Sequence, residues 1–317
     1  MEPIRTGVIG VGHLGYHHAR LYHALDEAEL VGVVDPDPGK AARARDDFGV
    51  PSFRTVEDLV NAGVQAVSVV VPTREHHAVT LELLAHGIDV LVEKPIAASL
   101  DEARDMVAAA ERHGRLLQVG HIERFNGAVI ALMGAFREPR FIECHRLSPY
   151  PMRGHDVSVV HDLMIHDLEI ALALDTSGVA AVDASGVAVF SSTEDIANAR
   201  IRFHSGCVAN ITASRISVEK MRKIRLFSAE AYVSTDYSEQ EVMVYRKKEG
   251  PVPEGVNPMM HITVEPLSVT REEPLKLELA AFVDCVRERR QPIVTGQDGL
   301  NALALAERIV ESIHAQG

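Results

Sequence analysis

Residues 6–15 read TGVIGVGHLG, and this stretch decides how the first half of the chain is interpreted. It opens on a short apolar run typical of a buried strand and leads into a helical pattern. Gly10, Gly12 and Gly15 follow the spacing G-x-G-x-x-G at this junction. There the first glycine permits a tight turn, the second lets backbone approach a pyrophosphate, and the third permits close packing of helix on strand. The stretch therefore predicts a dinucleotide-binding loop.

Asp35 extends this interpretation to the choice of dinucleotide. It ends the second expected strand, 35 − 15 = 20 residues after Gly15. A carboxylate there accepts hydrogen bonds from ribose hydroxyls and repels a 2′-phosphate. The alternative is a solvated turn residue before Pro36. We expect NAD rather than NADP as the cofactor, with His13 and Leu14 of the glycine-rich loop also in contact with it.

The first 120 residues alternate short apolar runs with helical patterns, which is typical of βαβ units and a parallel sheet. Ser99 and Glu102 predict a capping box for a helix that ends at Gly114. We therefore expect a Rossmann-type, doubly wound parallel sheet over residues 1–122. Its expected strands are residues 6–9, 30–34, 66–71, 89–92 and 116–119.

The remaining residues, 123–317, have a different texture, with longer segments rich in Thr, Val and Ile joined by polar turns. Such segments predict a second, α+β domain with a large, mostly antiparallel sheet. Its expected strands are residues 141–147, 180–190, 197–203, 207–214, 224–227 and 241–246. Its expected helices are residues 124–136, 157–174, 275–289 and 298–315.

Composition excludes several classes of protein. The chain has 317 residues, 46% of them hydrophobic and 24% charged, which is ordinary globular usage. A net charge of −13 disfavours nucleic acid and anionic membranes as partners. Three scattered cysteines and no leader-like or membrane-spanning apolar run favour a cytoplasmic protein.

The tripeptide Glu93-Lys94-Pro95 stands at the end of an expected parallel strand, where open α/β sheets bind their ligands. Pro95 restricts the backbone of Lys94, so the lysine is held rigidly. Taken alone, such a lysine is most often a surface charge. Together with the glycine triplet, the tripeptide resembles the E-K-P signature of the Gfo/Idh/MocA oxidoreductase family.

The same family has a loop at the nicotinamide end of its cofactor, and Val71-Pro72-Thr73 with His76 resembles it. The resemblance implies an NAD-dependent sugar dehydrogenase with its substrate domain in the second half of the chain. It also implies further contacts to the cofactor from Pro72, Thr73, His76, Glu93 and Lys94.

A D-x-x-x-H pair in the second domain completes the family's catalytic set, and Asp162 and His166 match it. A spacing of four residues puts both side chains on one face of an α-helix. Without Lys94, an ordinary surface contact would be the better interpretation of this pair. With Lys94, the resemblance implies that all three residues are catalytic. No metal is expected, because His161 and His166 lie five residues apart, about 140° round a helix.

Three longer motifs resemble one branch of this family, the nucleotide-sugar 3-dehydrogenases, and most closely those acting on UDP-N-acetylglucosamine. They are residues 119–126 (VGHIERFN), 162–167 (DLMIHD) and 212–215 (TASR). Glu169 departs from the commonest pattern, in which an aspartate follows the histidine by three. This resemblance implies oxidation of C3 to a 3-keto sugar, which passes to a PLP-dependent aminotransferase in the synthesis of a diamino-sugar lipid A.

A UDP-sugar carries two phosphate charges, so a protein of net charge −13 needs a local basic group to bind it. Arg124 and Asn126 lie just beyond an expected strand end and are candidates, as is Arg215. Arg215 belongs to a basic cluster that is equally well interpreted as a solvated face or an oligomer contact. The other members are Lys220, Arg222, Lys223 and Arg225.

Two other functions stay open at this point. One is a free sugar or polyol dehydrogenase of the inositol type, which would need no basic cluster. The other is a non-catalytic NAD-binding regulator, which would have no use for Lys94, Asp162 and His166 together. For any of these functions, an exposed sheet face in the second domain predicts a homodimer or homotetramer.

Overall fold

A computed structural model describes residues 2–136, 138–150, 157–229, 231–248, 250–252, 254–255 and 257–315. The chain forms two compact units. Unit 1 comprises Met1–Phe125 and Glu273–Leu303, and unit 2 comprises Asn126–Glu272 and Ala304–Gly317. The division lies three residues from the expected boundary at 122/123, but a late segment returns to unit 1, where α8 (Pro274–Glu288) buries apolar side chains.

Unit 1 contains a six-stranded parallel sheet in the order β3-β2-β1-β4-β5-β6, which confirms the expected doubly wound class. The interior strands β4 and β5 are buried along their whole length, as expected for a sheet covered on both faces. The strands are β1 (Ile4–Ile9), β2 (Ala28–Val34), β3 (Ser52–Phe53), β4 (Ala66–Val69), β5 (Asp89–Glu93) and β6 (Leu117–Gly120).

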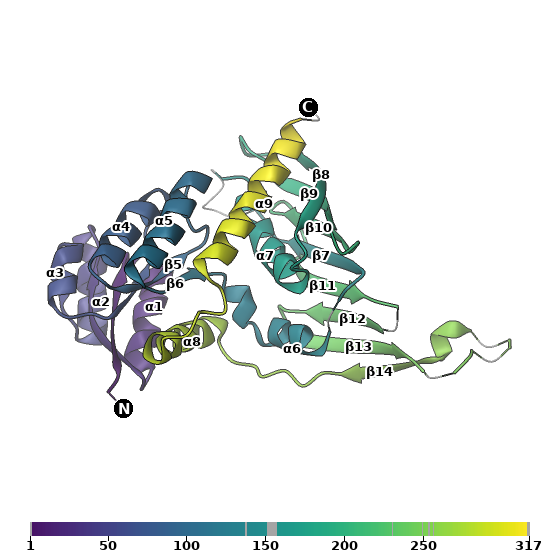
Figure 1. Ribbon diagram of the computed structural model, residues 1–317, viewed down its shortest axis with the longest axis horizontal. Helices are drawn as coiled ribbons and strands as arrows, with labels where there is room; N and C mark the ends of the chain where they lie inside the picture. Colours follow the sequence, from purple (N-terminus) through teal and green to yellow (C-terminus); the bar gives the residue numbers. More distant parts are fainter. Residues whose placement is uncertain are drawn as a thin grey trace. The chain divides into compact units, whose positions relative to one another are not determined.

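Helices cover both faces of this sheet. α4 and α5 lie side by side over one face (Figure 1) and contribute Leu83, Leu84 and Met106 to its core. α1 and α8 pack together in a second core, which contains Tyr22 and Phe282. The helices of unit 1 before α8 are α1 (His13–Ala24), α2 (Pro38–Phe48), α3 (Val56–Asn61), α4 (Thr73–Ala85), α5 (Leu100–His113) and the 3₁₀ turn η1 (Ile122–Phe125).

Unit 2 contains an eight-stranded sheet in the order β14-β13-β12-β11-β7-β10-β9-β8 (Figure 1). The β7–β10 pair is parallel and every other neighbouring pair is antiparallel, which confirms the expected mostly antiparallel sheet. The strands are β7 (Phe141–Leu147), β8 (Val179–Val187), β9 (Ile196–Phe203), β10 (Val208–Ser214), β11 (Met221–Phe227), β12 (Ala231–Asp236), β13 (Glu241–Lys247) and β14 (Ile262–Pro266).

The helices of unit 2 share one hydrophobic core with this sheet, to which α6, α7 and the last part of α9 contribute Leu132, Leu168 and Ile309. Along β9, buried and exposed side chains alternate, so one face packs on this core and the other faces outward. The helices are α6 (Gly127–Ala135), the π-helical turn η2 (Val160–Met164), α7 (Ile165–Leu174), the 3₁₀ turn η3 (Pro258–Met260) and α9 (Gly296–His314), which begins in unit 1.

Two expected helices differ from the structure. The helix expected over residues 124–136 is divided, because Asn126 caps α6 with its side chain in an extended backbone conformation. The helix expected over residues 157–174 begins as a π-helical turn, so the spacing along its first part is not that of an α-helix.

The capping box expected for α5 is only half formed. The hydroxyl of Ser99 accepts from the backbone N–H of Glu102, as expected. The carboxylate of Glu102 accepts from the backbone N–H of Ala98 and not from that of Ser99.

Candidate active site

The glycine-rich loop of unit 1 has the shape that a dinucleotide requires. Gly10 has a φ of +87°, and a Cβ there would lie 2.4 Å from the carbonyl oxygen of Val70. A Cβ on Gly15 would lie 1.7 Å from the carbonyl oxygen of Gly10, so this glycine is needed for packing. A Cβ on Gly12 would meet nothing within 4 Å. The first and third glycines therefore serve the fold, whereas the second borders open space where a pyrophosphate fits.

The start of α1 borders the same space. His13 and Leu14 are its first two residues, and both side chains are exposed. Gly12 precedes them as the N-cap and has no side chain with which to cap the first turn. Backbone N–H groups at a helix start bind anions well when no side chain competes for them. The loop residues therefore fit a bound NAD, and these contacts stay a prediction.

Asp35 is tied to this loop by its side chain. One carboxylate oxygen accepts from the backbone N–H of Val11 at 2.8 Å, and the other accepts from the N–H of Asp37 at 2.8 Å. These bonds hold the carboxylate at the carboxyl end of β2, directly beside the glycine-rich loop. A negative charge fixed there fits ribose hydroxyls better than a 2′-phosphate.

The nicotinamide loop is organised around a buried histidine. Nδ1 of His76 lies 2.9 Å from the carbonyl oxygen of Pro95, and Nε2 lies 2.9 Å from that of Val71. Burial lowers the pKa of His76 below its ordinary value, although the hydrogen bonds to Pro95 and Val71 act in the opposite direction. A neutral imidazole has a single N–H, so His76 donates to one of these two carbonyl oxygens while its other ring nitrogen lies beside the second. In this loop Pro72, which precedes α4, is exposed, and Val71 and Thr73 are half-buried.

The tripeptide with Lys94 lies at the carboxyl end of β5, as expected. Glu93 is buried, and one of its carboxylate oxygens accepts from the backbone N–H of Lys94 at 3.2 Å. The Lys94–Pro95 peptide bond is cis. Glu93 and Gly120 are the last residues of the parallel strands β5 and β6, and they pair in the sheet register. Lys94 and His121, which follow them, therefore lie at the carboxyl ends of two neighbouring strands.

His121 is the site residue that sequence reasoning missed. Its side chain is buried, and burial together with the charges of Lys94 and Arg124 lowers its pKa to about 3. The ring is therefore neutral at physiological pH. Half-buried Arg124 lies in the turn η1 that follows it. Lys94 was identified as a polar residue directly after a parallel strand. His121 follows β6 in the same way, so its position in the sequence could have identified it as well.

In unit 2 the expected D-x-x-x-H pair lies on two kinds of helix. Asp162 belongs to the π-helical turn η2, and His166 belongs to the first turn of α7. Both side chains are half-buried, whereas Met164 and Ile165 between them are buried. Single π-helical turns occur often at functional sites. The pair is thus accessible, although the α-helical spacing assumed for it does not apply to its first member.

A buried ion pair lies beneath this helix. Nε of Arg146 on β7 donates to Asp167 at 2.9 Å, and the hydroxyl of Tyr237 donates to the same carboxylate. The backbone carbonyl of Tyr237 accepts from the side chain of Asn126 at 3.0 Å. Asn126, expected to contact the substrate, is therefore buried as the cap of α6 and as a tie to this cluster. Because Asp167 follows His166 in α7, these bonds hold the turn of the helix that carries His166.

Arg215 has a different place from the one expected of a phosphate ligand. Its side chain is 0% exposed, and Nε donates to Asp195 at 2.8 Å. The other oxygen of Asp195 accepts from three consecutive backbone N–H groups, those of residues 189–191. Burial alone would raise the pKa of Asp195, but the hydrogen bonds from Ser191 and Arg215 hold it below its ordinary value. Arg215 anchors a loop of unit 2, and its contact with a diphosphate stays a prediction that this geometry does not support.

The rest of the basic cluster is partly neutralised on the surface of the eight-stranded sheet of unit 2. Lys223 lies 3.6 Å from Asp236, and Arg225 lies 3.2 Å from Glu143. Exposed pairs of this kind contribute little to stability and leave little net charge for a ligand. In the cluster, the solvated-face interpretation therefore fits Lys223 and Arg225 best. Arg124, half-buried in unit 1, is the stronger candidate for a phosphate contact.

Comparison with known proteins identifies the family. Residues 4–121 match the sequence-family model for the NAD-binding Rossmann fold of the Gfo/Idh/MocA oxidoreductases. Residues 154–316 match the family model for their C-terminal α/β domain. The chain belongs to the Gfo/Idh/MocA oxidoreductase family. Its NAD-binding domain is the part that carries the glycine-rich loop, Asp35 and Lys94.

Three known proteins resemble the whole chain to different degrees. UDP-N-acetylglucosamine 3-dehydrogenase of Acidithiobacillus ferrooxidans is 34% identical over 316 residues, which cover 99% of each chain, and its solved structure has a TM-score of 0.92. The NAD(+)-dependent scyllo-inositol 2-dehydrogenase of Bacillus subtilis is 28% identical, covering 94% of this chain and 90% of that one. The structure of the WlbA dehydrogenase of Bordetella pertussis, solved with NADH and UDP-GlcNAcA, matches with a TM-score of 0.83 at 20% identity. The match covers 100% of this chain and 97% of that one, and at this identity it shows the fold alone.

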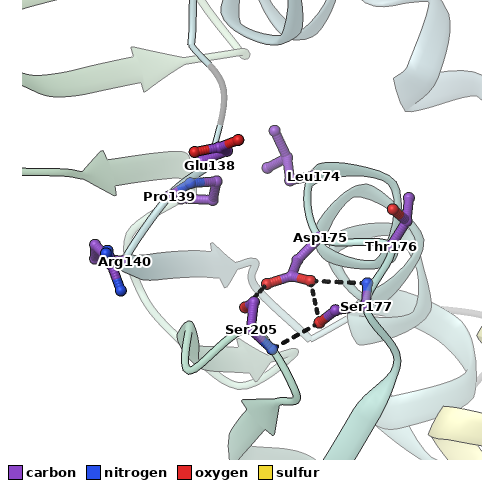
Figure 2. Close-up of a pocket in the computed structure, with 8 residues that line it drawn as sticks. All are labelled: Glu138, Pro139, Arg140, Leu174, Asp175, Thr176, Ser177 and Ser205. Carbon is purple, nitrogen blue, oxygen red and sulfur yellow. Dashed lines mark hydrogen bonds between the residues drawn. The ribbon is translucent and has the colours of Figure 1, made fainter.

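The Gfo/Idh/MocA chain also has a polar cavity away from the residues discussed above. It has a volume of about 390 Å³ and lies between the end of α7 and the β9–β10 turn (Figure 2). The carboxylate of Asp175 accepts from the backbone and hydroxyl of Ser177 at 3.0 and 2.6 Å and from the hydroxyl of Ser205. These groups satisfy one another, and no residue expected at the active site lines the cavity. We assign it no ligand.

Within the described part of the chain, no group of three or more His, Cys, Asp or Glu side chains is arranged to hold a metal ion. Among the same residues, no helix combines the length and the apolar composition needed to cross a membrane.

Proposed function

We propose that this oxidoreductase uses NAD to oxidise the C3 hydroxyl of UDP-N-acetylglucosamine to the 3-keto sugar. The observation that carries the proposal is the 34% identity to a UDP-N-acetylglucosamine 3-dehydrogenase over 99% of both chains. Lys94, Asp162 and His166 are all present, so the residues that the family uses for proton transfer are retained. A non-catalytic regulator would not need them.

The chemistry divides between the cofactor and the side chains. NAD, when bound at the loop of Gly10 to Gly15, accepts the hydride. As the hydride leaves, negative charge develops on the sugar oxygen, so a group must remove the hydroxyl proton and another must stabilise the oxygen. We assign proton removal to His166 and stabilisation of the oxygen to the ammonium of Lys94. Asp162 would orient the imidazole, as a carboxylate commonly does.

The nucleotide part of the substrate needs a cation. Arg124 is the candidate, because the guanidinium can bind a phosphate through two parallel hydrogen bonds. Affinity for a UDP-sugar should then fall with salt, since accessible charge pairs are screened over about 10 Å at 0.1 M ionic strength. Arg124→Ala should raise the KM for the UDP-sugar more than it changes the Kd for NAD.

A free polyol or sugar is the second candidate substrate, because the chain is also 28% identical to a scyllo-inositol 2-dehydrogenase over 94% of its length. The experiment that separates the two candidates offers NAD with UDP-N-acetylglucosamine, free N-acetylglucosamine or scyllo-inositol and records NADH. We expect NADH from the UDP-sugar and competitive inhibition by UDP alone. Oxidation of scyllo-inositol with no inhibition by millimolar UDP would favour the alternative.

Lys94→Met is the control for that experiment. It should lower kcat by roughly two to four powers of ten, the usual scale for a lost acid or base, while the Kd for NAD stays nearly unchanged. A variant that turned over UDP-N-acetylglucosamine as fast as the wild type would remove Lys94 from the mechanism.

The cellular setting belongs to the same proposal. A 3-keto sugar is a substrate for a PLP-dependent aminotransferase, so we propose such an enzyme as the next in sequence, in the cytoplasm and in the synthesis of a diamino-sugar lipid A. Co-expression with a candidate aminotransferase should yield the 3-amino sugar, and accumulation of the 3-keto sugar with every aminotransferase tried would argue against it.

We further propose that the chain forms a homodimer or homotetramer through the outward face of the eight-stranded sheet of unit 2. Four half-buried aromatic rings form a row across this face. The ring centroids of Phe141 and Phe227 are 5.9 Å apart, those of Phe227 and Tyr232 are 4.9 Å apart, and those of Tyr232 and Tyr245 are 4.6 Å apart. Apolar surface of this kind favours association. Light scattering should give a dimer or tetramer mass for the wild type and a smaller mass for Tyr232→Arg.

A further inference from the structure

A buried histidine contacts the tripeptide that carries Lys94. His18 lies on α1, and its side chain is 0% exposed. Its Nε2 lies 3.2 Å from Oε1 of Glu93. The second oxygen of the same carboxylate, Oε2, accepts from the backbone N–H of Lys94 at 3.2 Å. A continuous path of hydrogen bonds therefore runs from α1 through Glu93 to the backbone of Lys94.

The environment of Glu93 explains why it needs this partner. The residue is 7% exposed and lies at the end of a strand buried along its whole length. A buried carboxylate is costly unless hydrogen bonds compensate for the lost water. Packing holds it tightly, since a Cβ on Gly120 would lie 2.9 Å from its Oε1. The imidazole of His18 supplies a donor to that same oxygen.

Within the described residues, the imidazole of His18 makes no side-chain hydrogen bond other than the one to Glu93. Its Nδ1 is buried and has no hydrogen-bond partner there, so the contact with Glu93 accounts for the polar chemistry of the ring. An apolar side chain would fill the same core position without leaving a ring nitrogen unsatisfied. A histidine at this position is therefore better explained by its bond to Glu93 than by packing.

The other side of Lys94 is held as well. The carbonyl oxygen of Pro95 lies 2.9 Å from Nδ1 of the buried His76. Lys94, whose side chain is half-buried, therefore lies between Glu93, which is held through its carboxylate, and Pro95, whose carbonyl oxygen lies against His76. The backbone of Lys94 has little freedom to move while both neighbours are fixed.

We infer that His18 is a positioning residue for Lys94, acting through the carboxylate of Glu93. The inference rests on the proposed function, in which the ammonium of Lys94 meets the reacting oxygen. Displacement of a catalytic group by about 1 Å lowers turnover roughly a hundredfold. His18 also follows the glycine-rich loop on the same helix, so α1 links the cofactor loop to the lysine.

The test compares His18→Leu with a matched control on the same helix. Tyr22→Phe removes another fully buried hydrogen bond of α1, from Tyr22 to Ser68 at 2.8 Å, that does not involve the tripeptide. We expect His18→Leu to lower kcat by roughly tenfold to a hundredfold, with the KM for the sugar and the Kd for NAD within threefold of wild type. Tyr22→Phe should keep kcat within twofold. His18→Gln, which retains a donor, should restore most of the loss.

A double-mutant cycle shows whether the effect passes through Glu93. In a Glu93→Gln background, His18→Leu should cost less than threefold, since the carboxylate it holds is gone. Should His18→Leu not fold, His18→Asn replaces it, because its shorter amide loses contact with Glu93 but keeps a polar group. A kcat for the His18 variant within twofold of wild type, or an equal loss in Tyr22→Phe, overturns the inference.

Hydrogen exchange separates this inference from the proposed function. Peptides that span Lys94 should exchange faster in His18→Leu than in the wild type or Tyr22→Phe, whether or not any sugar is turned over. If the wild type fails to oxidise UDP-N-acetylglucosamine, the proposed function is lost and the exchange result still decides the role of His18. Unchanged exchange around Lys94 in the His18 variant refutes that role.

Discussion

Alanine substitutions at Gly12 and Gly15 should separate binding of the cofactor from stability of the fold. The two positions belong to one loop, yet the surroundings of an added methyl group are opposite. At Gly15 the methyl carbon would lie 1.7 Å from the carbonyl oxygen of Gly10, which is backbone and cannot yield cheaply. At Gly12 it would meet nothing within 4 Å. Gly15→Ala should therefore lower the stability of the fold, whereas Gly12→Ala should weaken only the binding of the cofactor beside the loop.

The magnitudes follow from these contacts. Gly15→Ala should cost more than about 4 kcal/mol of unfolding free energy, because strand, turn and helix must all move to relieve the overlap. Gly12→Ala should change stability by less than about 1 kcal/mol. Beside the pyrophosphate, however, the methyl group should disrupt one charge-assisted hydrogen bond, worth about 1.5–3 kcal/mol, and so raise the Kd for NAD roughly tenfold to a hundredfold.

Thermal unfolding with and without NAD measures both effects. At a concentration 100 times its Kd, NAD stabilises the wild type by about 2.7 kcal/mol, whereas a hundredfold weaker Kd leaves only about 0.4 kcal/mol. Gly12→Ala should therefore unfold like the wild type without NAD and should lose at least about half of the stabilisation that NAD gives the wild type. Wild-type NAD affinity in Gly12→Ala, or wild-type stability in Gly15→Ala, would refute the assignment of roles within the loop.

Three further predictions follow from single residues. Asp35 should make the enzyme prefer NAD over NADP by at least tenfold in kcat/KM, about 1.4 kcal/mol, and equal use of both cofactors would contradict this. His121 has a pKa of about 3 when folded against 6.5 when unfolded, so its contribution to stability is complete above pH 6.5 and is lost as the pH falls toward 3. The slope of about 1.4 kcal/mol per pH unit predicts a loss of about 2 kcal/mol between pH 7 and pH 5 that His121→Asn should abolish, and denaturant titrations at the two pH values measure it. Arg215→Met should cost about 3–5 kcal/mol by leaving Asp195 buried without its partner, and a variant as stable as the wild type by chemical denaturation would show that the pair is dispensable.

The sequence was most informative where the structural cause is local. The first strand and its loop depend on glycine spacing and an apolar run within residues 6–15, so both could be predicted. Short elements such as the two-residue strand Ser52–Phe53 carry too little pattern to be found. The strand β14 escaped as well, because none of its residues is buried. The strand β12 was missed although Val233 and Thr235 are buried in alternation, because one of these two residues is polar and the sequence therefore lacks an alternating apolar pattern.

Other features depend on partners far away along the chain. Arg215 was predicted to bind a diphosphate because its neighbours in sequence are basic, but its partner Asp195 lies 20 residues upstream. His76 was read as a cofactor contact, although its ring meets backbone carbonyls that no side-chain pattern reveals. The π-helical turn around Asp162 was also invisible, since apolar spacing over one turn does not distinguish it from an α-helix.

We propose that hydride leaves C3 of a UDP-linked sugar. UDP-N-acetylglucosamine that carries deuterium at C3, incubated with the wild-type enzyme and NAD, tests this proposal. We predict that the NADH formed carries that deuterium, as read by mass spectrometry, and that Lys94→Met forms it far more slowly. NADH without deuterium, or no NADH from this sugar while scyllo-inositol reduces NAD, would contradict the claim.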